Sequence, residues 1–446
     1  MKCLGRTRWS AVQIAAEIVA VLGLALVLLQ CGGYPVSKIQ HIVIVFQENR
    51  TPDNLFHGLP NADIANSGVN SQGQVIPLAP VSLDTPYDLG HSHESFVQMY
   101  NGGKMDGADK VAATCGTHCP PNPQFAYVNP SEVAPYFQMA EQYTFGDRMF
   151  QTQQGPSFPA HQFIISGTSA PTATSNLFAA ENVTGAMAPV TQTFVRSGCM
   201  GPRGATVAFI DPSGRESQTG FTCFEHPTLI DLLDAQHLSW RYYTTNYSWQ
   251  SVIWTGPNAI HHLRFGPDWA NVIPSPTQVL TDIANGQLAT VSWVIPTGQA
   301  SDHSAVSDGS GPSWVASVVN AIGNSQYWSN TAILVTWDDW GGWYDHVAPP
   351  IYNSYEYGFR VPLIVISPYA KAHYVSHKMH DFGSILRFVE DTFGLGGLGY
   401  ADARADDLAD CFDFRQTPLK FQTISAPLDA QHFLEDKTPP ADPDDD

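Results

Sequence analysis

Two short apolar runs, far apart in the chain, are each followed by side chains that carry oxygen atoms. The runs and these side chains are 39–46 with Glu48 and Asn49, and 332–335 with Asp338 and Asp339. Apolar runs of this length predict buried strands. In an open α/β sheet, polar groups that follow parallel strands meet at the carboxyl edge of the sheet. If the two strands are parallel neighbours, the four side chains converge on one edge.

Strand-like and helix-like segments alternate along the rest of the chain. The predicted strands are 39–46, 205–210, 239–243, 288–295, 331–337 and 361–367, and the predicted helices are 131–143, 228–236, 277–284, 314–323 and 381–394. Such alternation is typical of an α/β fold, in which helices cover both faces of a mostly parallel central sheet. The chain has 446 residues, 43% of them hydrophobic, and we expect a single domain over 34–438. Residues 53–125 are rich in Gly, Asn and Pro and predict an elaborated loop near the acidic edge.

The charge balance narrows the choice of partners. Lys and Arg total 21 against 41 for Asp and Glu, which gives a net charge of -20. A nucleic-acid partner requires a basic surface, and so does electrostatic docking to anionic lipid. The composition therefore argues against nucleic acid, and it leaves the oligomeric state open.

The N-terminus has the features of a targeting segment. Basic residues precede an apolar run at 18–29, as in a secretory signal peptide. For residues 1–33 an uncleaved membrane anchor is the alternative, and Cys31 adds that of a lipoprotein. We therefore expect an exported protein, periplasmic or secreted. The tail 439–446 is acidic and rich in Pro, which predicts disorder.

Export makes disulfides possible. Beyond Cys31 the cysteines are Cys115, Cys119, Cys199, Cys223 and Cys411. Five is an odd number, so at least one is free or pairs outside this set. Cys199 and Cys223 are candidates for a disulfide that closes a loop. Cys115 and Cys119 predict either a small disulfide loop or half of a zinc site, although no second cysteine pair completes such a site.

The side chains at the two strand ends form a candidate cation site. Glu48, Asn49, Asp338 and Asp339 offer hard oxygen donors, which suit Mg²⁺, Ca²⁺ or Mn²⁺, and added histidines would admit Zn²⁺ or Fe. Neighbouring Trp and Tyr residues would leave the carboxylates poorly solvated, and a cation offsets that cost. The alternatives are an acidic turn or helix cap and a simple ion pair of Glu48 with Arg50.

Ser157 is the candidate nucleophile. It stands between Pro156 and Pro159, and an apolar helix-like stretch comes after it at 162–165. This places the hydroxyl at a loop-to-helix junction, where backbone N–H groups can receive an anion. Coordination to a cation would lower the pKa of the hydroxyl and activate it. An ordinary helix-capping serine is the alternative.

Among the 16 histidines, those placed near predicted strand ends or in the polar loop include His91, His93, His303 and His346, and the candidates for the site are His91, His303 and His346. A side chain whose ordinary pKa is close to neutral suits proton transfer to a leaving group. We favour His303 as this general acid because its separate loop can face the side opposite Ser157. His346 comes after the acidic turn and is expected to support the metal. Five others are expected to be surface or structural residues, namely His261, His262, His373, His377 and His380.

Taken in order, these motifs resemble a known family. They are Glu-Asn-Arg, Asp-Leu-x-His, Gly-Pro-Ser-x-Pro, Asp-His, Trp-Asp-Asp-x-Gly-Gly-x-x-Asp-His-Val and Gly-Phe-Arg-Val-Pro. Over residues 38–395 they look like the bacterial phospholipase C and acid phosphatase family of the alkaline phosphatase superfamily. The resemblance implies an alkaline-phosphatase-like fold and a divalent cation bound by Glu48, Asn49, Ser157, Asp338 and Asp339. It also implies that Ser157 is the nucleophile, that His91, His303 and His346 line the pocket, and that Arg360 is structural.

The expected function is metal-dependent hydrolysis of a phosphate ester, with a phosphomonoester, a phospholipid or a phosphocholine ester as substrate. The aromatic stretch 240–269 is a candidate for binding a choline headgroup, although such residues are more often core. Two positions depart from the family pattern. His161 replaces the Arg of a Ser-x-Pro-x-Arg pattern shared with sulfatases, and Phe382 replaces the His of Asp-His-x-Ser. A sulfatase and a non-catalytic, metal-stabilised surface protein are the alternatives.

Overall fold

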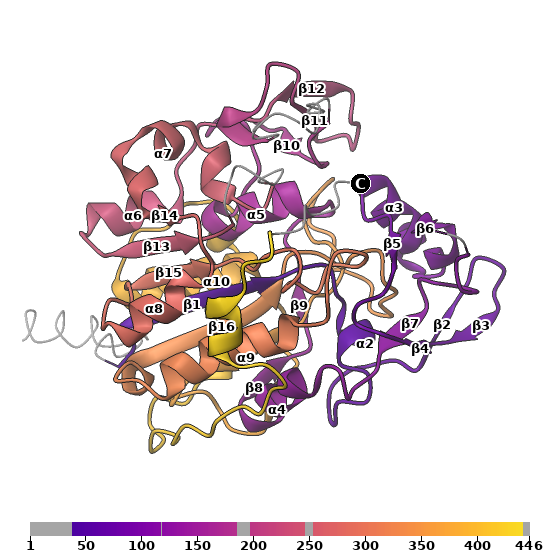
Figure 1. Ribbon diagram of the computed structural model, residues 1–446. Helices are drawn as coiled ribbons and strands as arrows, with labels where there is room; N and C mark the ends of the chain where they lie inside the picture. Colours follow the sequence, from indigo (N-terminus) through magenta and orange to yellow (C-terminus); the bar gives the residue numbers. More distant parts are fainter. Residues whose placement is uncertain (1–37, 117, 185–196, 246–252, 440–446) are drawn as a thin grey trace, which may run out of the picture.

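Eight strands form the central sheet of the computed structural model, which describes residues 38–116, 118–184, 197–245 and 253–439. In spatial order they are β14 (Val272–Ile273), β13 (Trp240–Tyr243), β15 (Val291–Val294), β1 (His41–Gln47), β16 (Thr331–Trp337), β17 (Leu363–Ile366), β8 (Thr144–Gly146) and β18 (Tyr374–Ser376). Figure 1 shows this sheet at the centre of the molecule, with β1 and β16 in its middle.

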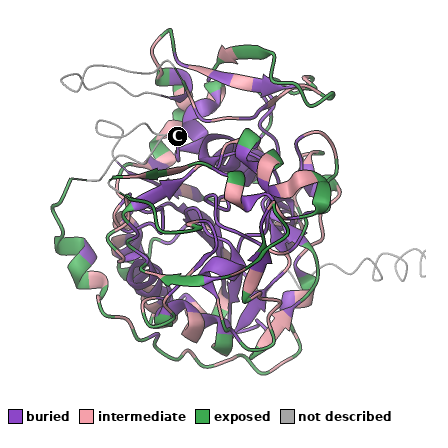
Figure 2. Ribbon diagram, turned by 90° about the vertical axis from the view of Figure 1, so that its right-hand side faces the viewer, coloured by how far each residue is buried: buried purple, intermediate pink, exposed green. Residues whose placement is uncertain are grey.

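The strand directions confirm the predicted mostly parallel sheet. From β14 to β16 each strand runs parallel to its neighbour, and β8 runs parallel to β18. Of the strands described in this sheet, only β17 is antiparallel to both of its neighbours. Every residue of β15, β16 and β17 is buried, as expected for strands covered on both faces (Figure 2).

One predicted strand lies outside the central sheet. Residues 205–210 form β11 (Thr206–Ile210), which pairs antiparallel with β10 (Phe178–Ala179) and β12 (Gln218–Phe221) in a separate sheet. Within β11, Thr206 and Ala208 are half-buried while their neighbours are buried. This alternation is typical of an antiparallel sheet with one solvated face, so the run 205–210 lacked the continuous burial of a central strand.

Helices cover both faces of the central sheet (Figure 1). On one face α9 (Gly311–Gly323) contacts α4 (Ala134–Gln142) and α8 (Gln278–Ala284), and on the other α5 (Ser157–Ser166) contacts α6 (Leu229–Ala235) and α10 (Phe382–Phe393). α10 has the predicted ends. The Asp381 carboxylate accepts the Ser384 N–H at its start, and Gly394 closes it with a φ of 64°. The predicted α/β fold is therefore confirmed.

Residues 53–125 contain local structure instead of one irregular loop. Their elements are α2 (Pro52–Leu55), β2 (Ser67–Val69), β3 (Val75–Pro77), β4 (Ala79–Val81), β5 (Tyr87–Leu89), α3 (His93–Tyr100) and β6 (Ala113–Cys115), followed by β7 (Ala126–Val128). Phe96, Met99 and Phe125 form a second small core with Trp340. Figure 1 shows this segment beside one end of the central strands, on the right.

The remaining described strands and α-helices are β9 (Met149–Phe150), α7 (His261–Phe265), β19 (His380–Asp381) and α11 (Ala430–Glu435), and short 3-10 helices lie between the elements. Among the described residues, none of the helices combines the length and apolar character needed to cross a membrane. The predicted signal peptide or anchor at 1–33 lies outside the described residues, as does the tail 439–446 apart from Pro439.

The described part of the chain contains two disulfides, and both involve predicted partners. Cys115 pairs with Cys119, and Cys199 pairs with Cys223. The first pair therefore forms the small disulfide loop and not half of a zinc site. Cys411 is free and buried.

Candidate active site

The two strands that end in polar side chains are neighbours. β1 and β16 pair in parallel, and the last paired residues are Gln47 and Trp337. Glu48 and Asp338 are the next residue on each strand, so the register itself brings them side by side. The Asn49 N–H donates to Asp338 Oδ1 over 3.0 Å and ties the two strand ends together.

A tight turn fixes the aspartate pair. Asp338 Oδ1 accepts the Asp339 N–H over 2.7 Å, and Asp339 Oδ1 accepts the Gly341 N–H over 2.7 Å. Gly341 has a φ of 60°, and a Cβ there would lie 2.3 Å from the Asn49 carbonyl oxygen. Only glycine allows this close approach without strain. Each aspartate thus has one oxygen held by the backbone and presents the other, Oδ2, to the site.

Several buried oxygen atoms at this edge have no hydrogen-bond partner. They are both carboxylate oxygens of Glu48, Oδ1 of Asn49 and Oδ2 of Asp338. Burial, and then the neighbouring Asp338 carboxylate, raise the pKa of Glu48 well above its ordinary value, and the same two causes raise the pKa of Asp339. Removing an unpaired carboxylate from water costs several kcal/mol. A divalent cation with oxygen ligands offsets this cost, so the donor set fits such an ion.

Ser157 opens α5 and faces the aspartate pair. Its side chain is buried, and its hydroxyl donates to Asp339 Oδ2 over 3.5 Å. The N-cap of α5 is Pro156, so the Ser157 hydroxyl does not have the helix-capping role of the alternative interpretation. The first turn offers fewer backbone donors than expected, because the Phe158 N–H bonds to Asn182 Oδ1 and Pro159 has none.

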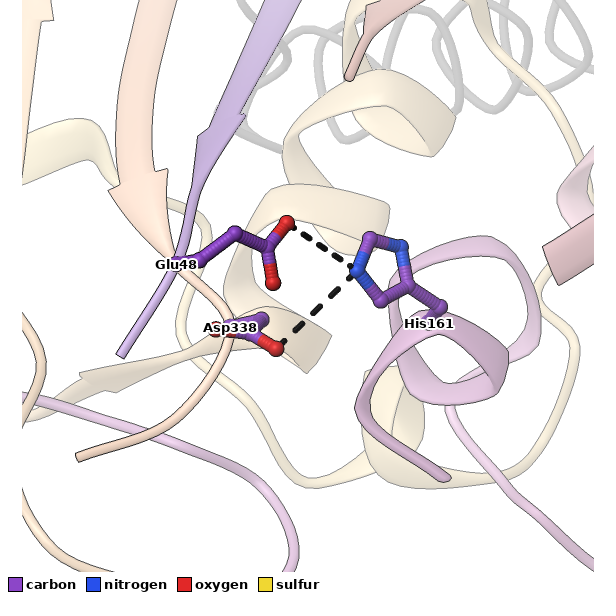
Figure 3. Close-up of side chains that lie close together, drawn as sticks. All are labelled: Glu48, His161 and Asp338. Atoms are coloured by element: carbon purple, nitrogen blue, oxygen red, sulfur yellow. Dashed lines mark ion pairs between the residues drawn. The ribbon is translucent and has the colours of Figure 1, made fainter. Parts of the chain in front are cut away.

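His161 lies one turn further along α5 and faces the same group of oxygens. Its Nε2 is 3.4 Å from Glu48 Oε1 and 4.0 Å from Asp338 Oδ2, and all three side chains are fully buried. Figure 3 shows Glu48 and Asp338 approaching the imidazole from the two neighbouring strand ends. This contact was not among the sequence-based predictions. The available signal was the four-residue spacing from Ser157, which places both residues on one face of a helix.

His91 orients one of the predicted metal ligands. Its Nδ1 lies 2.9 Å from the Leu89 carbonyl oxygen, which can only accept, so Nδ1 carries the proton. Its Nε2 therefore accepts from the Asn49 side-chain amide over 3.2 Å. This bond turns the Asn49 NH₂ group toward His91 and leaves Oδ1 as the ligand atom of the amide.

His303 lies next to His91, on the loop that comes after β15. The two imidazole rings are 5.8 Å apart, and the Trp254 ring is 6.1 Å from His303. Arg50, the last residue of the Glu-Asn-Arg motif, fixes this loop by donating from Nε to the Asp302 carbonyl oxygen over 2.8 Å. His303 Nδ1 faces the Ser304 carbonyl oxygen at 2.7 Å, so Nε2 is the nitrogen that can exchange a proton in the site.

His346 belongs to a different group of charges. Arg360 donates to both oxygens of Asp345 over 2.9 Å and to Asp53 over 3.2 Å. His346 Nδ1 lies 2.8 Å from Asp53 Oδ2, and its Nε2 lies 3.1 Å from Asp63. Arg360 pairs with Asp345 and Asp53, and Arg148 pairs with Asp63, so these carboxylates have cationic side chains as partners. The structure thus supports the structural role of Arg360, and it places His346 with Arg360 instead of with Ser157.

We expect His346→Gln to lower the melting temperature more at about pH 6 than at about pH 9. Burial alone would lower the pKa of His346, but the hydrogen bond and charge of Asp53 raise it above its ordinary value. A raised pKa contributes stability that is fully present below the unfolded value of about 6.5 and is lost as the pH rises through the folded value. Thermal denaturation at both pH values measures the difference. His261→Gln, at an exposed position, is the control, and equal losses at both pH values would contradict the assignment.

Most of the described aromatic side chains in the stretch 240–269 lie away from the site. Trp240 donates to Asp234, and Tyr243 donates to Asp282, both from β13. Trp269 packs against Arg264. Of the described aromatic residues in this stretch, Tyr242 and Trp254 contact His161. Tyr247 and Trp249 lie outside the described residues.

Comparison with known proteins identifies the family of this chain. The sequence model described as Phosphoesterase family matches residues 39–396. The chain therefore belongs to the phosphoesterase family, and at that level the prediction of a hydrolase acting on phosphoric esters is confirmed. The predicted resemblance is thereby confirmed at the level of the phosphoesterase family.

Curated relatives include two enzymes named phospholipase C. The non-hemolytic phospholipase C of Pseudomonas aeruginosa is 24% identical over 85% of this chain and 58% of its own length. Phospholipase C B of Mycobacterium tuberculosis is 23% identical over 87% of this chain and 80% of its own length. The chain thus spans less than two thirds of the Pseudomonas enzyme.

Solved structures show weaker likenesses. A protein in the alkaline phosphatase superfamily from Vibrio parahaemolyticus has a TM-score of 0.36 and 11% identity, over 82% of this chain and 70% of its own. A lipoteichoic acid synthase from Listeria monocytogenes has a TM-score of 0.38 and 11% identity, over 85% of this chain and 78% of its own.

Proposed function

We propose that this chain is an exported, metal-dependent phosphoester hydrolase of the acid phosphatase or phospholipase C type, with Ser157 as its nucleophile. The main supporting observation is that β1, β16 and α5 meet at one point. There the Ser157 hydroxyl contacts the buried carboxylate of Asp339, which follows Asp338 in the chain, and Glu48 follows the neighbouring strand. Membership of the phosphoesterase family and relatives named phospholipase C support the reaction class.

Five residues would hold the cation, namely Glu48, Asn49, Ser157, Asp338 and Asp339. A divalent cation bound there lowers the pKa of the serine hydroxyl and neutralises charge on the phosphoryl oxygens. Asp339 Oδ2 accepts the hydrogen bond of Ser157 and thereby sets the direction of its oxygen. His91 holds the Asn49 amide in its ligand orientation.

The chain's own groups account for the bond changes. Ser157 loses its hydroxyl proton to solvent and its Oγ attacks phosphorus, the bond from phosphorus to the leaving oxygen breaks, and that oxygen takes a proton from a histidine. The product of this step is a phosphoserine and a free alcohol. Water then attacks phosphorus and gives a proton to the histidine, which restores it, while the bond to Ser157 Oγ breaks and the serine oxygen takes a proton from solvent. We assign the proton donor to His303, whose Nε2 is the exchangeable nitrogen.

His303→Ala should slow an alkyl phosphate far more than an activated aryl phosphate. An aryl oxide leaves without protonation, whereas an alkoxide needs a proton in the transition state. General acid catalysis is worth about 10² to 10⁴-fold, so the ratio of the two rate losses should reach about 10²-fold. Steady-state kcat/KM on both substrates measures this ratio.

His346→Ala is the matched control, because His346 pairs with Asp53 and Asp63 in the separate charge group. It should leave the ratio of the two rates unchanged. A selective loss on the alkyl substrate in His346→Ala, with equal losses in His303→Ala, would reverse the assignment.

One panel assay tests the reaction class. The purified mature protein is incubated with a phosphomonoester, a phosphocholine ester, a phospholipid and a sulfate ester, each with and without a chelator. We expect hydrolysis of at least one phosphate ester and its loss with the chelator. Turnover of the sulfate ester alone would make the protein a sulfatase. Turnover of none would leave a metal-stabilised, non-catalytic protein.

The exported location rests on the apolar run at 18–29 and on the two disulfides. Disulfides persist in oxidising compartments such as the periplasm and the exterior of the cell. N-terminal sequencing of the protein from cell fractions checks this. An intact Met1 on protein in the cytoplasmic fraction would contradict export.

A further inference from the structure

Ser157 and His161 lie on one face of α5, where Ser157 is near Asp339 and His161 is near Asp338. They are four residues apart, so their side chains lie one above the other on the helix. Ser157 Oγ lies 3.5 Å from Asp339 Oδ2, and His161 Nε2 lies 4.0 Å from Asp338 Oδ2. The helix that carries the nucleophile Ser157 therefore also places an imidazole nitrogen beside the same pair of aspartates, Asp338 and Asp339.

The hydrogen bonds of Tyr242 define the protonation of His161. The Tyr242 hydroxyl lies 2.8 Å from the Trp254 carbonyl oxygen, and since a carbonyl can only accept, Tyr242 donates its one proton there. His161 Nδ1 lies 3.3 Å from the Tyr242 oxygen and must therefore be the donor in that contact. In the neutral imidazole, the proton on Nδ1 leaves Nε2 with a lone pair.

That lone pair faces atoms that also carry lone pairs. Nε2 is 3.4 Å from Glu48 Oε1 and 4.0 Å from Asp338 Oδ2 (Figure 3). All three atoms are buried without a hydrogen-bond partner. Three buried acceptors that converge in this way are stabilised by a cation between them.

The spacing of Nε2 and Glu48 Oε1 suits two ligands of one ion, whereas Asp338 Oδ2, at 4.0 Å from Nε2, is more widely spaced than a tetrahedral pair. Two ligands about 2.1 Å from a tetrahedral ion are roughly 3.4 Å apart, which matches the distance from Nε2 to Glu48 Oε1. The ring cannot turn away, because Tyr242 holds Nδ1 and the rings of Phe46 and Trp254 lie 5.7 Å and 6.5 Å from it.

We propose that His161 is a nitrogen ligand of the metal centre and selects a transition-metal ion such as Zn²⁺ over Mg²⁺ and Ca²⁺. The proposal rests on the metal site of the proposed function and adds the choice of metal to it. Imidazole suits zinc and other transition metals, whereas magnesium and calcium bind almost entirely through oxygen. The departure of residue 161 from arginine thus changes the chemistry of the centre.

Two measurements on the metal-free full-length protein test this without any enzyme assay. In calorimetric titrations, the wild type should bind Zn²⁺ at least about 10²-fold more tightly than Mg²⁺. His161→Gln should reduce the Zn²⁺ affinity by about 10²-fold or more and change the Mg²⁺ affinity little. Pulsed electron paramagnetic resonance of the Cu²⁺-loaded wild type should show coupling to an imidazole nitrogen, and His161→Gln should lose it. His226→Gln, at another buried histidine, should retain both properties.

The outcomes separate this inference from the proposed function. Nitrogen coupling that persists in folded His161→Gln, or an equal loss of Zn²⁺ and Mg²⁺ affinity, overturns the role of His161 and leaves the carboxylate site intact. In the alternative, His161 is protonated and its positive charge takes the place of the metal ion. The Cu²⁺-loaded wild type would then show no coupling to an imidazole nitrogen, and this result also overturns the inference. A wild type that binds no divalent cation overturns both proposals. If His161→Gln does not fold, His161→Asn is the second variant, and the wild-type spectrum already decides whether an imidazole is bound.

Discussion

Ser157→Ala should abolish hydrolysis while the protein stays folded. The hydroxyl is the only part of the side chain that the variant removes, and its observed partner is Asp339 Oδ2 at a long 3.5 Å. No helix-capping bond is lost, because the N-cap of α5 is Pro156. Loss of a nucleophile that forms a covalent intermediate lowers kcat by on the order of 10⁴-fold or more. We therefore expect a catalytic loss far beyond any change in thermal stability.

Ser166→Ala is the matched control for this prediction. Ser166 also lies on α5 and is buried, and its hydroxyl donates to the Gln162 and Thr168 carbonyl oxygens. The control should lose some stability and keep its activity. Rates on the best substrate of the panel and melting curves measure both effects. Comparable activity in Ser157→Ala and the wild type would move the attack to a water molecule.

Asp338→Asn should lose the metal and most activity without disturbing the turn. Asparagine keeps the Oδ1 atom that accepts from the Asn49 and Asp339 N–H groups. At Oδ2 it substitutes an NH₂ group, which cannot bind a cation. Because replacing outer residues of a metal site already costs about 10 to 100-fold in affinity, loss of a ligand should cost at least about 100-fold. Metal content after gel filtration and kcat/KM are the measurements.

The effect of Asp338→Asn on the melting temperature should change sign between metal-free and metal-saturated protein. In chelator, Asp338→Asn should melt at a higher temperature than the wild type, since it removes one of several crowded carboxylates. After burial, the charge of Asp338 contributes most to the raised pKa of both Glu48 and Asp339. In saturating metal the wild type should melt higher, because ligand binding stabilises the folded state. Glu94→Gln, an exposed carboxylate on α3, should show neither effect. A wild type indifferent to chelator would contradict the cation site.

The acidic edge could be predicted from the sequence because its signal is local. The runs before Glu48 and Asp338 are mostly apolar, and parallel strands place the residues after them on one edge. The adjacency of β1 and β16 was a conditional expectation, and their pairing confirms it. Ser157 could be found from its prolines, since they mark a loop-to-helix junction.

The contacts of His161 with Glu48 and of His346 with Asp53 could not be predicted from local sequence. His161 reaches Glu48 only because α5 packs across the carboxyl ends of β1 and β16, which depends on tertiary packing. His346 is close to Asp338 in sequence, but the turn at Gly341 and Gly342 redirects the chain toward Asp53. A histidine that comes after an acidic motif can therefore pair with a separate group of charged side chains, as His346 does with Asp53 and Asp63.

The stereochemical course at phosphorus tests the central claim, that Ser157 attacks the substrate and forms a phosphoserine. A substrate made chiral at phosphorus with oxygen isotopes or sulfur is hydrolysed, and the configuration of the product is determined. Each in-line displacement inverts phosphorus, so attack by Ser157 followed by attack by water predicts net retention. Net inversion would show a single displacement by water and would contradict the account.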